Sequence, residues 1–223
     1  MEFKVSFNVN HNLYLKDPEQ SELGKLIVKA AIDLIYELGF EGFTFKKLST
    51  SINTTEASVY RYFENKHKLL LYILNWYWSY MEFIVEYKLQ NISDKKTKIK
   101  TVIDLLTNEL PESNNKLDYN KKYISQIVIC ESSKAYFVKD IDKINKDELF
   151  KPYKDLCAHI ASIITDYNSK YKYPKSLSST IIETSHYQQF FSLHLPKLTD
   201  VQTKTKKNYT NQYLNDMVFH ILG

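Results

Sequence analysis

Residues 30–70 read AAIDLIYELGFEGFTFKKLSTSINTTEASVYRYFENKHKLL and contain the start and stop signals of several short helices. Gly39 follows an apolar pattern of helical period and is expected to end a first helix in the left-handed conformation. Capping threonines predict a second helix over about Thr44–Ile52 and a third over about Thr55–Phe63. Asn53-Thr54 between them is a tight turn, because asparagine tolerates left-handed dihedral angles. Two short helices joined in this way are typical of a helix-turn-helix unit.

The same periodicity extends on both sides of this unit. The first helix starts after Ser21, and its apolar stripe consists of Leu23, Leu26, Ile27, Ala30, Ala31, Leu34, Ile35 and Leu38. Asn65 is suited to cap a long fourth helix that runs from Lys66 to about Lys88. Further helices are predicted near 94–110, 118–138, 144–170, 174–195 and 208–222, with prolines near several starts and breaks.

These elements predict an all-α protein, in which a three-helix head is joined by the long fourth helix to a larger helical-bundle body. Residues 21–65 are predicted to form the helix-turn-helix domain, and residues 66–223 are predicted to form the body. Residues 1–20 stand apart as an arm, since apolar and polar residues alternate there with the period of a strand. A single strand has no partner, so the arm is expected to be extended or disordered, or to lie against the body.

Composition excludes several classes of protein. The chain has two cysteines and four glycines, and no glycine lies between Phe43 and Leu222, so a disulfide framework and most phosphate-binding glycine loops are excluded. The sequence shows neither a signal peptide nor a transmembrane segment, which predicts a cytoplasmic protein without a membrane partner. No cofactor and no metal site are expected. The formal net charge of +4 is small, but Thr44–Lys68 alone contains five basic and two acidic residues.

The third helix has one apolar side and one side suited to DNA. Its apolar residues would pack with those of the second helix, and the interior is predicted to contain Phe43, Phe45, Leu48, Ile52, Val59 and Phe63. Small, hydroxyl-bearing and cationic side chains remain outside, where they can contact phosphates and base edges. The predicted DNA-binding residues are Thr44, Lys46, Thr55, Glu56, Ser58, Tyr60, Arg61, Tyr62 and Lys66. Arg61 is the only arginine, against 29 lysines.

The pattern AAIDLIYELGFEGFT at residues 30–44, followed by VYRYFENKHKLL at 59–70, resembles the N-terminal domain of the TetR family of tetracycline-repressor-like regulators. The resemblance implies a homodimer that binds a palindromic operator in double-stranded DNA, usually as a repressor, and that releases it when a small molecule enters the body. By position it carries over Thr44, Lys46, Thr55, Ser58, Tyr60 and Lys66. In the family, the tyrosine and the lysine at the last two positions hold phosphates.

Two departures from the family pattern fall at the turn and the start of the third helix. The family usually has Ala-Gly-Val where this chain has Ile52-Asn53-Thr54, so a polar threonine replaces a buried valine. Glu56 stands where a base-reading residue often stands. Its carboxylate could accept a hydrogen bond from cytosine N4, or it could simply interact with the dipole of the helix.

The body is expected to hold the effector and the dimer interface. The helix near 174–195 has apolar residues on two sides, which suits contact both with its own core and with a second subunit. With the resemblance, this places the homodimer interface on the helices near 174–195 and 208–222. Aromatic residues and polar groups within apolar helices indicate an effector pocket that includes Trp76, Tyr80, Phe83, Gln126, His159 and His186. The aromatic stripe that includes Trp76, Tyr80 and Phe83 is more often part of a core than of a ligand site.

Two other functions are compatible with parts of the sequence. The chain could be a helical dimer that senses or carries an apolar molecule and whose DNA-binding head is vestigial. Glu64-x-x-His67 and Glu183-x-x-His186 also have the spacing found in di-iron carboxylate bundles. Because a helix that starts at Lys66 leaves Glu64 outside it, the first pair would not share a helix face, and an enzyme is not expected.

Overall fold

A computed structural model describes residues 7, 9–108, 119–139, 141–202 and 208–223, and all regular structure in these ranges is helical. The chain divides into two compact units. The N-terminal unit comprises Met1–Tyr80 and Leu110–Lys151, and the C-terminal unit comprises Met81–Glu109 and Pro152–Gly223. Helix α4 (Lys66–Leu89) therefore contributes to both. The all-α prediction is confirmed over the described residues, and none of their helices is long and apolar enough to cross a membrane.

Helix α1 (Glu22–Gly42) is the central element of the head. The Ser21 side chain caps it by accepting a hydrogen bond from the amide of Gly24 at 3.1 Å. At Gly39 the backbone turns to φ 70°, so the predicted helix stop is confirmed, and one further helical turn follows. The buried face differs slightly from the predicted stripe: Val28 and Ile32 are buried, whereas Leu26 and Leu38 are each 43% exposed.

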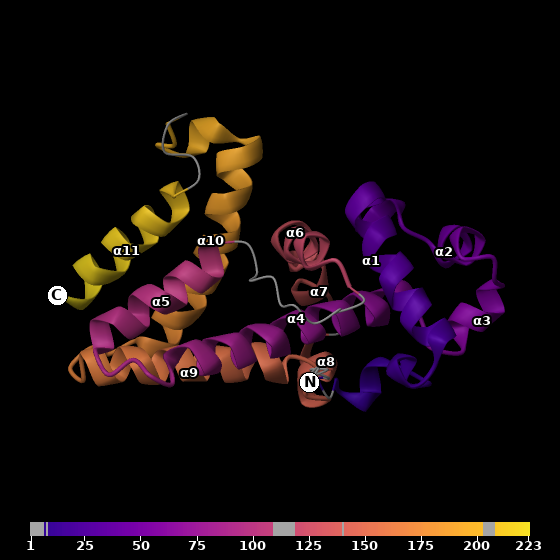
Figure 1. Ribbon diagram of the computed structural model, residues 1–223, viewed down its shortest axis with the longest axis horizontal. Coiled ribbons are helices and arrows are strands. Elements are labelled where there is room, and N and C mark those ends of the chain that lie inside the picture. Colours follow the sequence, from indigo (N-terminus) through magenta and orange to yellow (C-terminus); the bar gives the residue numbers. More distant parts are fainter. Residues whose placement is uncertain (1–6, 8, 109–118, 140, 203–207) are drawn as a thin grey trace. The chain divides into compact units, whose positions relative to one another are not determined.

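The helix-turn-helix consists of α2 (Phe45–Ser51) and α3 (Glu56–Tyr60), and Figure 1 shows both beside α1. Their predicted interior is confirmed at five positions, since Phe43, Phe45, Leu48, Val59 and Phe63 are at most 5% exposed. Ile52 at the end of α2 is only half-buried. Regular α3 ends earlier than predicted, but the amide of Phe63 still donates to the carbonyl of Val59 at 3.1 Å, so one helical turn continues.

The described part of residues 1–20 is neither a strand nor disordered. It contains the 3-10 helices η1 (His11–Leu13) and η2 (Pro18–Gln20), each capped by the residue before it. Val9 and Leu13 are 5% and 1% exposed, so this stretch packs against the N-terminal unit. The alternating pattern at positions 3 and 5 lies outside the described residues.

The remaining helices of the N-terminal unit are α6 (Lys121–Glu131), α7 (Ser133–Tyr136) and α8 (Ile141–Lys146), and α6 packs on α1. The helix predicted over 118–138 is thus two helices. The helix predicted over 144–170 is also wrong, because the chain breaks between α8 and α9 (Lys151–Tyr167). Glu148 adopts a φ of 57° there, and a left-handed residue ends a right-handed helix.

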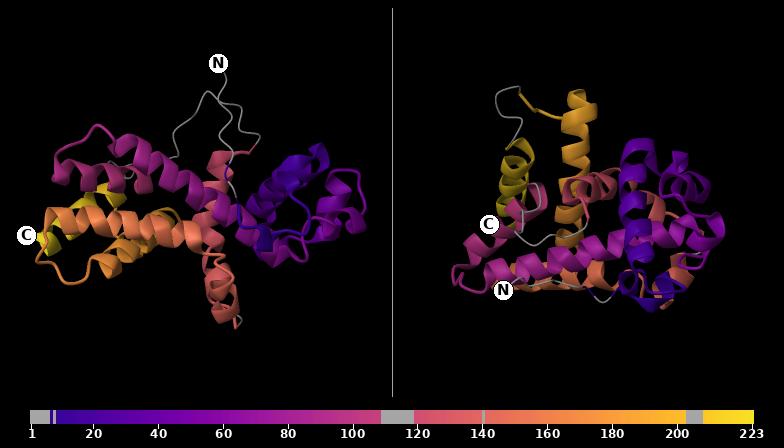
Figure 2. Two further views of the ribbon diagram at one scale, coloured as in Figure 1. Left: turned by 90° about the horizontal axis from the view of Figure 1, so that it is seen from below. Right: turned by 45° about the vertical axis from the view of Figure 1, so that its right-hand side comes forward.

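The C-terminal unit contains α5 (Lys95–Thr107), α10 (Pro174–His194), the 3-10 helix η3 (Pro196–Leu198) and α11 (Tyr209–Leu222), together with α9. Figure 2 shows α11, in yellow, near α10 and α5, with which it packs. Proline occupies the first position of α10 and the position just after its C-cap, as predicted. The core of this unit includes Ile103, Leu156, Ile164, Ile182, Leu214 and Val218.

Candidate nucleic-acid interface

The start of each helix of the helix-turn-helix is held by a threonine. The Thr44 side chain accepts from the amide of Lys47 at 3.2 Å, and the Thr55 side chain accepts from the amide of Ser58 at 3.2 Å. The Thr55 and Ser58 hydroxyls also share a hydrogen bond of 3.0 Å. Both predicted caps are confirmed. They leave other amides of the first turns able to meet an anion.

The turn between α2 and α3 departs from the family sequence but keeps a closed geometry. Asn53 has a φ of 51°, the left-handed conformation that a glycine would adopt most easily. The amide of Asn53 donates to the carbonyl of Thr50 at 3.3 Å. The amide of Thr54 donates to the carbonyl of Ser49 at 2.9 Å. Thr54 is half-buried rather than buried. The polar threonine is thus accommodated because its main chain is hydrogen-bonded and its side chain is partly solvated.

Most of the predicted DNA-binding residues are accessible. Tyr60 is 48% exposed, and its ring packs edge to face on Phe45, with 4.9 Å between centroids. This contact fixes the tyrosine ring while much of it remains at the surface. Ser58 is half-buried, and the exposed residues of the predicted set are Thr44, Lys46, Thr55, Glu56, Tyr60 and Arg61.

Tyr62 is an error of the sequence prediction. It is only 4% exposed, and its hydroxyl shares a 2.8 Å hydrogen bond with the Ser21 hydroxyl. The chain turns after α3, so Tyr62 points into the unit rather than continuing the outer side of the helix. Tyr62 is therefore not part of the candidate interface.

Lys66 opens α4 and is half-buried. Its Nζ donates to the carbonyl of Phe40 at 3.1 Å and lies 4.6 Å from the centroid of the Phe40 ring. An ammonium has three donors, so this bond leaves donors for another acceptor. Lys47, which the sequence pattern does not assign to the site, is exposed, and its Nζ donates to the carbonyl of Gly42 at 2.8 Å.

The six predicted pocket residues do not gather in one unit. Trp76, Tyr80 and Gln126 belong to the N-terminal unit, whereas Phe83, His159 and His186 belong to the C-terminal unit. Trp76 and Tyr80 are 5% and 2% exposed and their rings stack at 5.5 Å, so they form core.

The three other pocket residues differ in exposure. Phe83 is 40% exposed, whereas His159 is half-buried. His186 is buried, and desolvation lowers its pKa to about 4. An open cavity of about 440 Å³ in the C-terminal unit contains none of the predicted residues; its lining is Lys100, Thr101, Asp104, Asn211 and Asn215.

The geometry of the two E-x-x-H pairs does not match a di-iron site. Glu64 is exposed and precedes α4, so it shares no helix face with His67. The Glu183 carboxylate accepts a hydrogen bond from the Tyr153 hydroxyl at 2.7 Å. Among the described residues, no group of three or more His, Cys, Asp or Glu side chains could hold a metal ion.

The comparisons with known proteins agree with this geometry. The family model of the bacterial regulatory proteins of the tetR family matches residues 27–73, which span most of α1, all of α2 and α3 and the start of α4. A comparison with the curated proteins gives no match.

Three solved structures illustrate the shared fold. AibR, in complex with isovaleryl coenzyme A and operator DNA, is 15% identical with a TM-score of 0.51, over 87% of this chain and 95% of that chain. The transcriptional regulator FadR from Bacillus subtilis, in complex with stearoyl-CoA, is 15% identical with a TM-score of 0.58, over 88% and 96%. The superantigen PfiT is 13% identical with a TM-score of 0.58, over 89% and 96%.

At such low identities these structures show the fold alone, and one of the three is described as a superantigen, so the fold does not assign a function. The N-terminal match is more specific, because it falls on the helix-turn-helix. Residues 27–73 thus match the model of the tetR family regulators over the helix-turn-helix, and the chain as a whole shares its fold with solved transcriptional regulators.

Proposed function

We propose that the protein is a homodimeric repressor that binds a palindromic DNA operator through α2, α3 and the start of α4, and that a small molecule bound in the body releases it. The proposed DNA contacts are Thr44, Lys46, Thr55, Glu56, Ser58, Tyr60, Arg61 and Lys66. Tyr60 and Lys66 contact phosphates, and the outer side of α3 faces base edges in the major groove.

One observation carries this proposal: among the described residues, the five basic side chains of Thr44–Lys68 form no ion pair with a carboxylate. They are Lys46, Lys47, Arg61, Lys66 and Lys68. Three of these lysines donate instead to neutral main-chain carbonyls, those of Gly42, Phe40 and Asn12. The five charges therefore remain available to attract a polyanion.

The proposed dimer uses α10 and α11. Large apolar side chains remain at the surface of these helices and of the segment after α10: Tyr187, Leu193, Leu195, Leu198, Tyr213 and Ile221 are each 38–62% exposed. A second copy of the chain would cover such a surface, and a twofold dimer would present two heads to successive half-sites. Sedimentation at micromolar concentration should give a dimer. A monomer at that concentration would contradict this part of the proposal.

We propose that the effector is a small molecule. The solved relatives carry isovaleryl coenzyme A in AibR and stearoyl-CoA in FadR from Bacillus subtilis, so the fold can accommodate acyl-CoA ligands. In this chain, the proposed recognition groups are two polar residues of α10 in the C-terminal unit, half-buried Glu183 and buried His186. Neither residue lines the open cavity between α5 and α11.

The decisive experiment is selection of DNA by the full-length protein. The immobilised protein is incubated with sheared DNA from its own genome, and the retained fragments are sequenced. A recovered duplex and a random-sequence duplex of equal length are then compared by fluorescence anisotropy. The proposal requires at least about 1000-fold preference for the recovered duplex, the lower end for specific regulators. Retention of no sequence above background would favour a vestigial head.

Lys66→Ala then tests the phosphate contact. Loss of one phosphate contact should lower the slope of log Kd against log salt by about one, for both duplexes. Lys175→Ala is the matched control, because Lys175 is an exposed lysine at the start of α10 in the other unit, and its slope should equal that of the wild type. An unchanged slope for Lys66→Ala would remove Lys66 from the proposed interface.

A further inference from the structure

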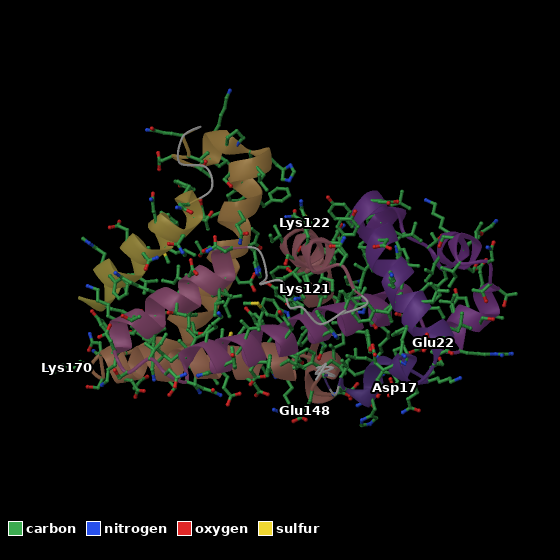
Figure 3. The ribbon with its side chains drawn as sticks, viewed as in Figure 1. Asp17, Glu22, Lys121, Lys122, Glu148 and Lys170 are labelled. Atoms are coloured by element: carbon green, nitrogen blue, oxygen red, sulfur yellow. The ribbon has the colours of Figure 1, made fainter. Side chains whose placement is uncertain are left out.

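The segment just before the region matched by the family model packs closely on the head. We define residues 9–21 as the strap. It lies wholly outside residues 27–73, which the family model matches, and it includes η1 and η2. Three of its apolar side chains, Val9, Leu13 and Pro18, are buried, whereas Leu15 is exposed. Figure 3 labels Asp17 within the strap and Glu22 just after it, at the bend where the strap meets α1.

Three contacts join the strap to Tyr62, just beyond the end of α3. The amide of Leu15 donates to the carbonyl of Tyr62 at 2.8 Å. The Ser21 hydroxyl is bonded to the Tyr62 hydroxyl at 2.8 Å, and the Nζ of Lys16 lies 5.2 Å from the centroid of the Tyr62 ring. The backbone, hydroxyl and ring of one residue are thus all contacted by the strap.

Other contacts fix the strap itself. The Nζ of Lys68 in the first turn of α4 donates to the carbonyl of Asn12 at 2.9 Å. At the far end, the Nδ2 of Asn10 donates to the carbonyl of Asp147, next to the left-handed Glu148, at 2.9 Å. The Glu19 carboxylate accepts from the Tyr119 hydroxyl. The strap is therefore anchored at both ends and in the middle.

Gly24 shows how closely the strap approaches α1. A Cβ at this position would lie 2.4 Å from the carbonyl oxygen of Pro18, and 2.6 Å and 2.8 Å from its Cα and carbonyl carbon. Real Cβ atoms do not approach other atoms so closely, and the obstacle is backbone rather than a movable side chain. Only glycine at position 24 lets η2 lie against α1 in this way.

We propose that the strap is a positioning element for DNA recognition: by holding Tyr62, it fixes the orientation of the C-terminal end of α3. Helix α3 has five residues, too few to be stable by itself, and it packs on α2 at its inner side. Tyr60 and Arg61 immediately precede the residue that the strap holds. This inference rests on the proposed DNA-binding function, in which those two side chains meet the operator.

Two full-length variants release the strap without altering a proposed DNA contact. Asn10→Asp keeps the oxygen that caps η1 but replaces the donor to Asp147 with a second oxygen, which the carbonyl repels. Gly24→Ala places a Cβ against the backbone of Pro18. Hydrogen exchange at the amide of Leu15 reports release directly, because that amide is bonded to Tyr62.

The informative quantity is the ratio of the Kd for the random-sequence duplex to the Kd for the recovered duplex. Partial unfolding lowers the active fraction for both duplexes equally and leaves the ratio unchanged. Misplacement of α3 should lower the ratio at least about fivefold, the size of one lost base contact. We expect faster exchange at Leu15 and this lower ratio in both variants.

Asn12→Asp is the matched control, because Asn12 contributes only main-chain atoms to the anchors and the change adds the same charge to the same turn. Its ratio should equal that of the wild type. An unchanged ratio in variants whose Leu15 amide exchanges faster would overturn the positioning role, as would an amide that stays protected in both. A wild-type protein without preference for any recovered duplex would refute the DNA-binding function instead, so the two failures are distinguishable.

Discussion

Glu131 in the N-terminal unit and Glu183 in the C-terminal unit are two glutamates removed from solvent to different extents and held in different surroundings. Glu131 is 7% exposed, and its Oε1 accepts from the amide of Phe40 at 3.1 Å while its Oε2 lies 2.6 Å from the Nζ of Lys134. Half-buried Glu183 accepts from the Tyr153 hydroxyl, and desolvation raises its pKa. One turn further along α10 is His186, whose pKa desolvation lowers to about 4.

The difference indicates different uses of buried polar groups. In the N-terminal unit the carboxylate is paired with a cation and joins α6 to the end of α1, which precedes the helix-turn-helix. In the C-terminal unit desolvation favours the neutral forms of the acid and the base. A paired charge holds two helices together, whereas polar groups whose charged forms are disfavoured by desolvation are suited to ligand recognition, as we propose for Glu183 and His186.

The largest effect is expected for Glu131→Ala. It leaves the buried amide of Phe40 without an acceptor and removes the nearer of the two carboxylates beside half-buried Lys134, which should cost about 3 kcal/mol of unfolding free energy. Urea denaturation at pH 7 measures it. The matched control is Glu41→Ala, since Glu41 is an exposed partner of the same lysine at 3.8 Å and should contribute less than about 1 kcal/mol. Equal losses of unfolding free energy in the two variants would show that burial of Glu131 does not make its contacts more stabilising than those of exposed Glu41.

An effect of intermediate size is expected for His186, which should make the free energy of unfolding depend on pH. Its folded-state pKa of about 4 lies below the model-peptide value of 6.5, so the unfolded chain binds the proton first as the pH falls. Stability is therefore lost on acidification below about pH 6.5, by roughly 2 kcal/mol between pH 7 and pH 5. His186→Gln should remove this part of the dependence.

The variant must be compared with the wild type, because Glu183 affects stability in the opposite direction to His186 as the pH changes. Its raised folded-state pKa makes the folded chain bind protons more tightly, so its contribution decreases as the pH rises through that value. Subtracting the stability curve of His186→Gln from that of the wild type isolates the histidine. A flat difference between pH 7 and pH 5 would show that His186 is solvated.

The smallest effect is expected for Glu183→Gln. The amide oxygen can still accept from the Tyr153 hydroxyl, and the variant no longer pays for desolvating a carboxylate at neutral pH. The free energy of unfolding at pH 7 should rise or stay equal, with a change below about 1 kcal/mol. A loss similar to that of Glu131→Ala would show that Glu183 acts as a paired charge, and the contrast between the two units would disappear.

The head could be predicted from the sequence because its signals are local. Thr44, Thr55 and Asn65 each accept a hydrogen bond from an amide three residues later, and Gly39 and Asn53 adopt the left-handed conformation that their types favour. Burial of Val59 and exposure of Tyr60 follow from helical period. The period fails at Tyr62, because regular helix ends two residues earlier.

The body and the strap depend on contacts between distant residues, which a single sequence does not reveal. Glu148 is not a residue type that signals a left-handed break, so the apolar pattern predicts a continuous helix over 144–170. Pro152, in the first turn of α9, is the one local signal that a new helix begins there. The role of Gly24 depends on Pro18 lying against it. Trp76 and Phe83 share a helical face, yet they belong to different compact units.

The single arginine has a practical consequence for chemistry. Arg61 is exposed and is the only guanidinium among 30 basic side chains. A dicarbonyl reagent that modifies guanidinium groups would therefore attach at one position, directly after α3, and leave the lysines largely unmodified. Protection of that position by a DNA duplex would map contact at a known point of the chain, and a fluorescent dicarbonyl would provide a site-specific probe without any substitution.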